Sequence, residues 1–272
     1  MRPLLLLVLA MAVMSLSTTA EADFEAGSRA FNAGDYATAA REFRFEAQSG
    51  NVDAMYLLGD LYATGRGVSK NDQEATRWYY RAVQGGERNA LNSLYRMAES
   101  GSVYGEFVLG VLYFEGRGVP RDLKASAGWM TRAAKQKFPL AAHYLGDMYL
   151  TGKGVEKDEA AAVQWYTVAA EQANPISMAV LGGLYKSGRG AELDRVEAFK
   201  WLYLAVGRFQ QMPKAYQQDN AKFFDNARRA LIAVKREMSD DEISEGQRRA
   251  KAFVIALKRR VQPPANSASP DG

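Results

Sequence analysis

Side chains that commonly carry chemistry are scarce in this chain of 272 residues, which contains no cysteine and a single histidine. Without cysteine there is no thiol nucleophile and no thiolate ligand, and one histidine cannot supply a histidine pair for a metal. His143 is therefore the one candidate general base, but it stands in a repeat whose aligned positions hold Tyr56, Phe107 and Ala179. The pattern predicts no catalytic residue, no bound metal and no cofactor, so we expect a chain that is not an enzyme.

The charge balance limits the class of partner. The chain carries 35 basic and 31 acidic side chains, a formal net charge of +4, and this excess is too small to indicate nucleic acid as a partner. Between residues 208 and 260 there are 13 Lys and Arg against 7 Asp and Glu. The local excess has two interpretations: a solvated outer face, or a surface for an acidic protein or for phospholipid headgroups.

The first 22 residues have the pattern of a secretory signal peptide. A short basic start precedes an apolar run over 4–16, and an A-x-A site ends at Ala22. The run is too short for a membrane span, which needs about 20 apolar residues, and no later segment is long enough either. We expect cleavage after Ala22, a periplasmic location and no membrane span; an uncleaved N-terminal anchor is the alternative.

Four tryptophans mark an internal repeat. They stand at 78, 129, 165 and 201, with spacings of 51, 36 and 36. The same spacings separate the Leu-Gly pairs that begin at 58, 109, 145 and 181, and the Gly-x-Gly loops that begin at 65, 116, 152 and 188. Self-similarity at such a period is typical of a solenoid. The longer first spacing indicates an inserted helix at about 87–101.

Each unit predicts two antiparallel helices. In the first unit a stripe of apolar residues at helical spacing ends at Gly65, because glycine enters a left-handed C-cap without strain. Asparagine or aspartate then caps the second helix in every unit, at positions 71, 122, 158 and 194. Trp78 and its equivalents are predicted to wedge the helices together in the core. The basic residue inside each glycine loop, Arg66 in the first unit, is either a solvated charge or part of a basic ridge for an acidic partner.

The segment AAHYLGDMYLTGKGVEKDEAAAVQWYTVAA, residues 141–170, carries the whole pattern. It resembles the Sel-1-like repeats, which are relatives of the tetratricopeptide repeat with a longer loop between the helices. The other units depart from it by small-for-small or apolar-for-apolar exchanges. The resemblance implies an all-α fold, a right-handed α-solenoid of antiparallel helix pairs similar to a tetratricopeptide superhelix.

The predicted organisation follows from the repeat and from the segments that flank it. It comprises a signal peptide over 1–22, a tetratricopeptide-like helix pair over 23–50, Sel-1-like repeats over 51–208, C-terminal helices over 209–260 and a disordered tail over 261–272. The C-terminal part is expected to hold a long helix from about 215 to 238 and a second helix over 242–260. Ser239 and Glu242 form the capping box that opens the second helix.

The concave face of a solenoid is built mainly from the first helix of each unit, so inward-facing positions of these helices are candidate partner contacts. The predicted contacts are Tyr56, Asp60, Tyr104, Phe107, Val111, Phe114, His143, Asp147, Leu150 and Lys186. Phe107, Val111 and Phe114 form an apolar row of the kind that anchors protein interfaces. The same row has a second interpretation, packing against the inserted helix or the next unit.

The function predicted from these features is binding rather than catalysis. Exported proteins that resemble this one act in envelope signalling, polysaccharide control and host contact, which implies a periplasmic scaffold or regulator that binds a protein partner on its concave face. The alternative is an immunity protein that neutralises a toxin directed to the periplasm. A hydrolase related to the cell wall is the less favoured third hypothesis, and the sequence does not identify the partner.

Overall fold

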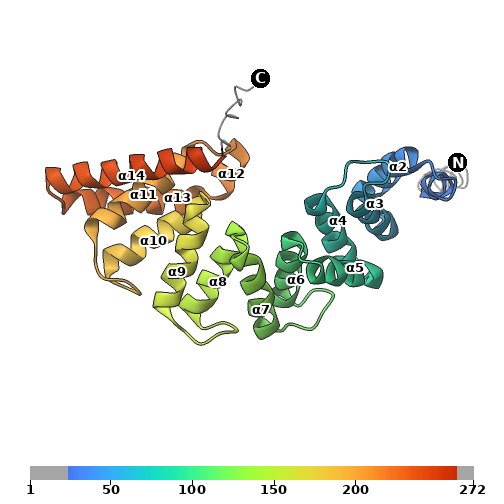
Figure 1. Cartoon of the computed structure of the whole chain (residues 1–272), viewed down its shortest axis with the longest axis horizontal. Helices are drawn as coiled ribbons and strands as arrows, with labels where there is room; N and C mark the ends of the chain where they lie inside the picture. The colour runs from blue at the N-terminus through green and yellow to red at the C-terminus, as the bar shows by residue number, and fades with distance from the viewer. Residues whose placement is uncertain (1–23, 262–272) are drawn as a thin grey trace, which may run out of the picture. The chain divides into compact units, whose positions relative to one another are not determined.

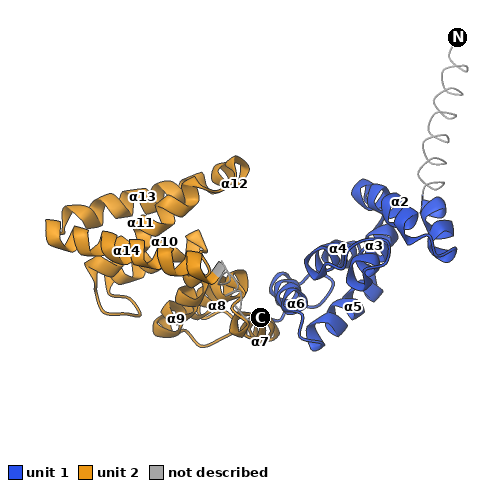
Figure 2. Cartoon of the chain, turned by 45° about the horizontal axis from the view of Figure 1, so that its top comes forward, with its two compact units in different colours: residues 1–122 blue, residues 123–272 orange. Residues whose placement is uncertain are grey.

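The structure, a computed structural model, describes residues 24–261. Within that range all regular secondary structure is helical, which confirms the predicted all-α class and the α-solenoid of helix pairs. The chain divides into two compact units, residues 1–122 and 123–272 (Figure 2). The predicted signal peptide over 1–22 and the predicted tail after Val261 lie outside the described residues.

The described part of unit 1 begins with a helix over 24–32 and continues with five further helices (Figure 1). These are α2 (Tyr36–Ser49), α3 (Val52–Thr64), α4 (Asp72–Gln84), α5 (Arg88–Glu99) and α6 (Val103–Glu115). Helix α3 packs against both α2 and α4, and α5 packs against α4 and α6. The predicted N-terminal helix pair and the predicted inserted helix, α5, are therefore both present.

Unit 2 contains eight helices in its described part. They are α7 (Leu123–Lys135), α8 (Pro139–Thr151), α9 (Glu159–Glu171), α10 (Pro175–Ser187), α11 (Arg195–Gln210), α12 (Lys214–Asp219), α13 (Ala221–Arg236) and α14 (Asp240–Val261). Helices α8 and α9 and helices α10 and α11 form the pairs of the third and fourth repeats. The last pair is then covered from one side, because α11 also packs against α13 and α14.

Turn and cap chemistry explains where the repeat helices end and begin. Left-handed glycines with φ between 65° and 75° end the first helix of every repeat, at positions 65, 116, 152 and 188. Asn71, Asp158 and Asp194 cap second helices as predicted, because each side chain accepts the backbone N–H three residues on, at 3.1, 2.9 and 2.9 Å. Helix α7 begins directly after Asp122.

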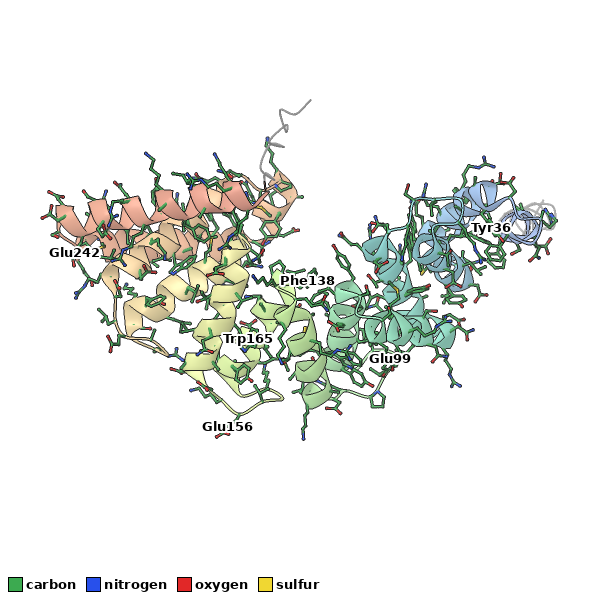
Figure 3. The ribbon with its side chains drawn as sticks, in the orientation of Figure 1. Tyr36, Glu99, Phe138, Glu156, Trp165 and Glu242 are labelled. Atoms are coloured by element: carbon green, nitrogen blue, oxygen red, sulfur yellow. The ribbon has the colours of Figure 1, made fainter. Side chains whose placement is uncertain are left out.

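The prediction of one long helix from about 215 to 238 is wrong, because the structure has two helices that meet at Asn220. The Asn220 side chain donates a hydrogen bond to the Tyr216 carbonyl at 2.9 Å, and its backbone leaves the helical region. Asparagine favours such local bonding over a helix interior. The capping box before α14 is confirmed: Ser239 N donates to Glu242, labelled in Figure 3, at 2.8 Å, and Glu242 N donates to Ser239 Oγ at 3.2 Å.

The core role predicted for tryptophan holds in two repeats only. Trp78 and Trp201 are buried, whereas Trp129 and Trp165 (Figure 3) are half-buried. In every second helix the large side chain after the tryptophan is buried: Tyr79, Met130, Tyr166 and Leu202 are each 2% exposed or less. The wedge between the paired helices is therefore this following residue, while the indoles of the middle repeats reach the surface.

Candidate protein-binding surface

A hydrogen bond between a buried tyrosine and an aspartate recurs in the first and third repeats. The Tyr79 hydroxyl on α4 donates to Asp60 Oδ1 on α3 at 2.5 Å, and the Tyr166 hydroxyl on α9 donates to Asp147 Oδ1 on α8 at 2.5 Å. Burial, followed by the bonded carboxylate, raises the pKa of both tyrosines. Each phenol therefore stays protonated and holds one predicted contact residue in a fixed position.

An aromatic ring stands one helical turn before each aspartate, where i and i+4 side chains share a face. The Tyr56 ring lies 6.1 Å from the Tyr79 ring, and the His143 ring lies 5.7 Å from the Tyr166 ring. Burial first, and then the neighbouring Asp60, raise the pKa of Tyr56. The structure thus joins four of the predicted contacts into two equivalent clusters of ring, carboxylate and buried phenol, one in each unit.

The cluster around His143 brings a serine, a histidine and an aspartate together. His143 Nδ1 lies 3.0 Å from Ser177 Oγ, and His143 Nε2 lies 3.6 Å from Asp147 Oδ2. Burial lowers the pKa of His143 and outweighs the opposite effect of Asp147, so the imidazole is neutral at pH 7. Ser177 is completely buried, and a substrate carbonyl cannot reach its hydroxyl. We assign this contact a structural role and not nucleophilic catalysis.

A charged cavity of about 310 Å³ surrounds Asp60 in unit 1. Its walls come from α3, the loop that follows it, α4 and the inserted α5. They bring together Asp60, Lys70, Asp72, Tyr79, Ser93 and Arg96. Arg96 donates to Ser93 Oγ at 2.8 Å. Both residues lie on α5, outside the repeat pattern, and were not among the predicted contacts. The available signal was the extra 15 residues between the first two units.

The remaining predicted contacts lie at other positions of α6, α8 and α10. Tyr104, Phe107, Val111 and Phe114 are half-buried residues of α6; Arg121 lies over the Phe114 ring at 6.0 Å and donates to the Phe114 carbonyl at 3.1 Å. In unit 2, Leu150 packs against the hydrophobic core, and Lys186 is half-buried in the last turn of α10. Both interpretations of the apolar row on α6 therefore stay open.

Local partners engage most of the basic residues of the glycine loops. Arg66 lies over the Tyr36 ring at 5.4 Å, Arg117 pairs with Glu115 at 3.5 Å, and Arg189 pairs with Glu159 at 2.6 Å. These contacts favour the interpretation as solvated loop charges over a continuous basic ridge.

These features define a helical repeat protein. Its candidate sites are the two clusters of ring, carboxylate and buried phenol, which can contact a partner and contain no identified catalytic group. The chain belongs to the Sel1 repeat family: the Sel1 repeat matches residues 52–87, 103–138, 139–174 and 175–206. Sel1 repeats indicate a scaffold for protein–protein interaction, and proteins of this family are typically not catalytic. Within residues 24–261 no group of three or more metal-ligating side chains is present, and no described helix is long and apolar enough to cross a membrane.

Solved structures with the same kind of fold include two bacterial proteins. One is c5321, a protective antigen present in uropathogenic Escherichia coli strains that displays an SLR fold, with 23% identity and a TM-score of 0.43 over 93% of this chain and 64% of that one. The chain thus spans less than two thirds of the length of that protein. The other is a Sel1 repeat protein from Oxalobacter formigenes, with 22% identity and a TM-score of 0.43 over 87% of this chain and 99% of that one.

Proposed function

We propose that this protein is an exported, periplasmic scaffold that binds a protein partner through the first helices of its repeats. The observation that carries the proposal is the charged cavity around Asp60. There a repeat helix, its pair and the inserted α5 bring acidic, basic and aromatic groups to one accessible place. Convergent polar groups of this kind fix the orientation of a bound surface and discriminate between partners.

The aspartate–tyrosine bond suits this role because the two residues have different tasks: the buried tyrosine holds the aspartate in place, and the aspartate contacts the partner. Tyr79 is buried and holds Asp60 Oδ1, so the carboxylate is fixed without a partner and loses little conformational freedom when one binds. Lys70 and Arg96 also line this cavity and give it two cations. A partner with both a hydrogen-bond donor and an acidic group at its contact surface is complementary to this arrangement.

The partner contact is tested by removing the charge of Asp60 while keeping its hydrogen bond with Tyr79. Asp60→Asn keeps an oxygen that can accept the Tyr79 hydroxyl, and Asp53→Asn makes the same exchange on an exposed position of α3 outside the cavity. Crosslinking in cells followed by mass spectrometry is expected to identify a protein that is lost with Asp60→Asn and retained with Asp53→Asn. Equal crosslinking of every protein by both variants would contradict the proposal, whereas a toxin as the lost protein would favour an immunity protein.

Export is tested separately from binding. The full chain is expected in the periplasmic fraction after osmotic shock, and a variant without residues 2–22 in the cytoplasmic fraction. Recovery of the full chain with the cytoplasm or with the membrane would contradict the proposed location without affecting the proposed contact.

A further inference from the structure

An apolar groove lies between the C-terminal halves of α11 and α14 in unit 2. It has a volume of about 590 Å³, in the range of small-molecule and peptide sites. Its walls include Tyr203, Leu204, Leu231, Phe253, Val254 and Leu257. None of these residues belongs to the clusters described above, and nothing in the repeat pattern predicted the groove.

The groove begins where the tight contact between α11 and α14 ends. The two helices run in the same direction, since Glu197 bonds Arg249 at 2.9 Å and Trp201 packs against Phe253 one turn later. Near the start of α14 their contact leaves no space, because a Cβ at Gly246 would lie 2.6 Å from the Phe199 ring. Beyond Ala250, no described residue of α14 is buried.

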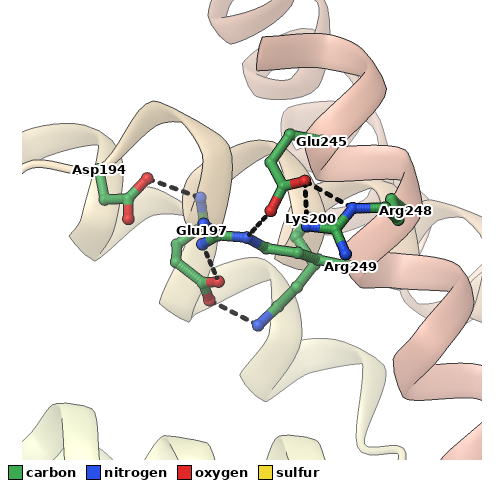
Figure 4. A network of polar contacts seen from close by, with 6 residues as sticks. All are labelled: Asp194, Glu197, Lys200, Glu245, Arg248 and Arg249. Carbon is green, nitrogen blue, oxygen red and sulfur yellow. Dashed lines mark hydrogen bonds and ion pairs between the residues drawn. The ribbon is translucent and has the colours of Figure 1, made fainter. Parts of the chain in front are cut away.

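A charge network locks the N-terminal halves of the two helices in this close contact (Figure 4). Glu197 accepts bonds from Arg249 and from Lys200 at 2.5 Å, and Glu245 bonds Arg248 and Arg249, each at 2.7 Å. These contacts fix one end of α14 on α11. The groove lies beyond this fixed contact, between the C-terminal halves of the same two helices.

The floor and rim of the groove are suited to side chains that enter from one face. A Cβ added at Gly207 on α11 meets no atom within 4 Å, so space is open above this residue. Tyr203 and Val254 at the rim remain 47% and 37% exposed, which leaves the groove open along its length. Arg208 on α11 and Lys258 on α14 add a cation from each side, and both residues are exposed.

We propose that this groove binds an acidic amphipathic helix of a partner protein. Leu-type side chains at i, i+3, i+4 and i+7 would fill the apolar floor, while carboxylates beside them would meet Arg208 and Lys258. The excess of 13 basic over 7 acidic residues between 208 and 260 gives the whole region the complementary sign. Residues 262–272, QPPANSASPDG, contain no large apolar side chain to occupy the groove. The inference rests on the proposed scaffold function but uses a different surface.

The test uses the full chain and a labelled 16-residue peptide with Leu at helical i, i+3, i+4 and i+7 positions and Glu elsewhere. Fluorescence anisotropy is expected to show saturable binding that weakens with salt, and weaker binding of a twin peptide with Lys in place of Glu. Gly207→Leu fills the open space, favours the helix and is expected to lower affinity about tenfold. Gly183→Leu on α10 is the matched control, because a Cβ there also meets nothing within 4 Å, and it is expected to bind as the wild type does.

Charge reversal distinguishes the effect of the two rim cations on peptide affinity from the effect of the net positive charge of this region. Arg208→Glu combined with Lys258→Glu is expected to lower affinity for the acidic peptide at least about fivefold. Lys222→Glu combined with Lys235→Glu changes the net charge equally on α13 at two positions that do not line the groove, and is expected to have a smaller effect. Circular dichroism checks that all variants fold.

Three outcomes would overturn the inference. They are equal binding of both peptides, displacement of the acidic peptide by dodecanoate at lower concentration than by unlabelled peptide, and self-association of the chain that Gly207→Leu abolishes. These would indicate non-specific adsorption, a lipid site or a site for a second copy, respectively. None of them affects the Asp60 experiment, so the proposed scaffold function and this inference fail independently.

Discussion

The first and third repeats contain the same aspartate–tyrosine bond, but different helices complete their surroundings. In the first repeat the inserted α5 contributes Ser93 and Arg96 and leaves a charged cavity beside Asp60. In the third repeat α10 contributes the buried Ser177, which bonds the His143 ring and leaves that side chain only 16% exposed. These two repeats therefore share the same support, and the helix that follows determines whether the cluster borders a charged cavity or has its ring buried against a serine.

Removal of the supporting phenols is expected to have the largest effect. Tyr79→Ala and Tyr166→Ala should each lower the free energy of unfolding by about 3–5 kcal/mol, because each removes a buried ring and a hydrogen bond. Denaturant unfolding followed by circular dichroism measures the change. Phe45→Ala, at a position 58% exposed on α2, is the control and should change stability by less than about 0.5 kcal/mol. A large effect in one repeat and none in the other would break the equivalence of the two clusters.

Removal of the hydroxyls alone tests the bond itself. Tyr79→Phe and Tyr166→Phe keep the ring and should each cost about 1 kcal/mol, because water can partly replace the lost donor at the aspartate. Asp60→Ala and Asp147→Ala, which remove the accepting oxygen, complete two double-mutant cycles, in which the coupling energy should be similar in both repeats. Additive effects within a cycle would mean that the tyrosine and the aspartate act independently in that repeat.

The sequence predicted the helices that carry these clusters better than it predicted the clusters themselves. The spacing of glycines and of Asn or Asp residues predicted the helix ends, because a left-handed turn and an N-cap depend on local chemistry. It also predicted an inserted helix. The burial of Tyr79 and Tyr166, which directly follow tryptophans, was not predicted. Which of two adjacent residues on a helix is more deeply buried depends on the helix packed against them, and the sequence pattern does not show that packing.

The features that depend on contacts between distant segments were not predicted. The cavity around Asp60 needs α5, which lies outside the repeat, and the apolar groove needs the separation of α14 from α11 some 50 residues earlier. The break at Asn220 within an apolar pattern was missed because one side-chain bond to the Tyr216 carbonyl outweighs helix periodicity there. Partner contacts predicted on α6 remain predictions.

The titration of His143 gives a smaller effect that distinguishes the third repeat from the first. Its folded pKa is below the unfolded value of 6.5 because of burial, although Asp147 opposes the shift. As pH falls below about 6.5 the unfolded state takes up a proton first, so stability declines until the folded pKa is reached, at no more than about 1.4 kcal/mol per pH unit. The neighbouring groups are Asp147, Tyr166, Ser177 and Tyr144.

His143→Tyr places the residue of the first repeat in the third and should remove this decline. Because His143 is the only histidine, the difference between the unfolding free energies of the two proteins from pH 7 downward reports on this site. The two curves should diverge just below pH 6.5. Parallel curves throughout that range would show that burial does not control the protonation of His143.

The glycine loops extend the comparison between the units and give the smallest expected effect. Arg66 in unit 1 stacks on Tyr36, whereas Arg189 in unit 2 pairs with Glu159 and, together with Lys157, lowers the pKa of that carboxyl to about 2. A lowered folded pKa stabilises the fold above the ordinary value of 4.5, and this contribution is lost as pH falls toward about 2. Since the Arg189 side chain is 52% exposed and its ion pair with Glu159 lies at the surface, Arg189→Ala should change global stability very little.

The sensitive measurement for this pair is therefore the carboxyl titration itself, followed by NMR. Arg189→Ala should raise the pKa of Glu159 toward its ordinary value, with Lys157 at 3.1 Å retaining part of the shift. Arg66→Ala is the matched loop variant and should leave that titration unchanged, because its own contact is with an aromatic ring in the other unit. If the pKa of Glu159 is unchanged after loss of Arg189, Arg189 has no more influence on this carboxyl than Arg66 has. The ion pair between Arg189 and Glu159 would then contribute nothing to the pKa shift in solution.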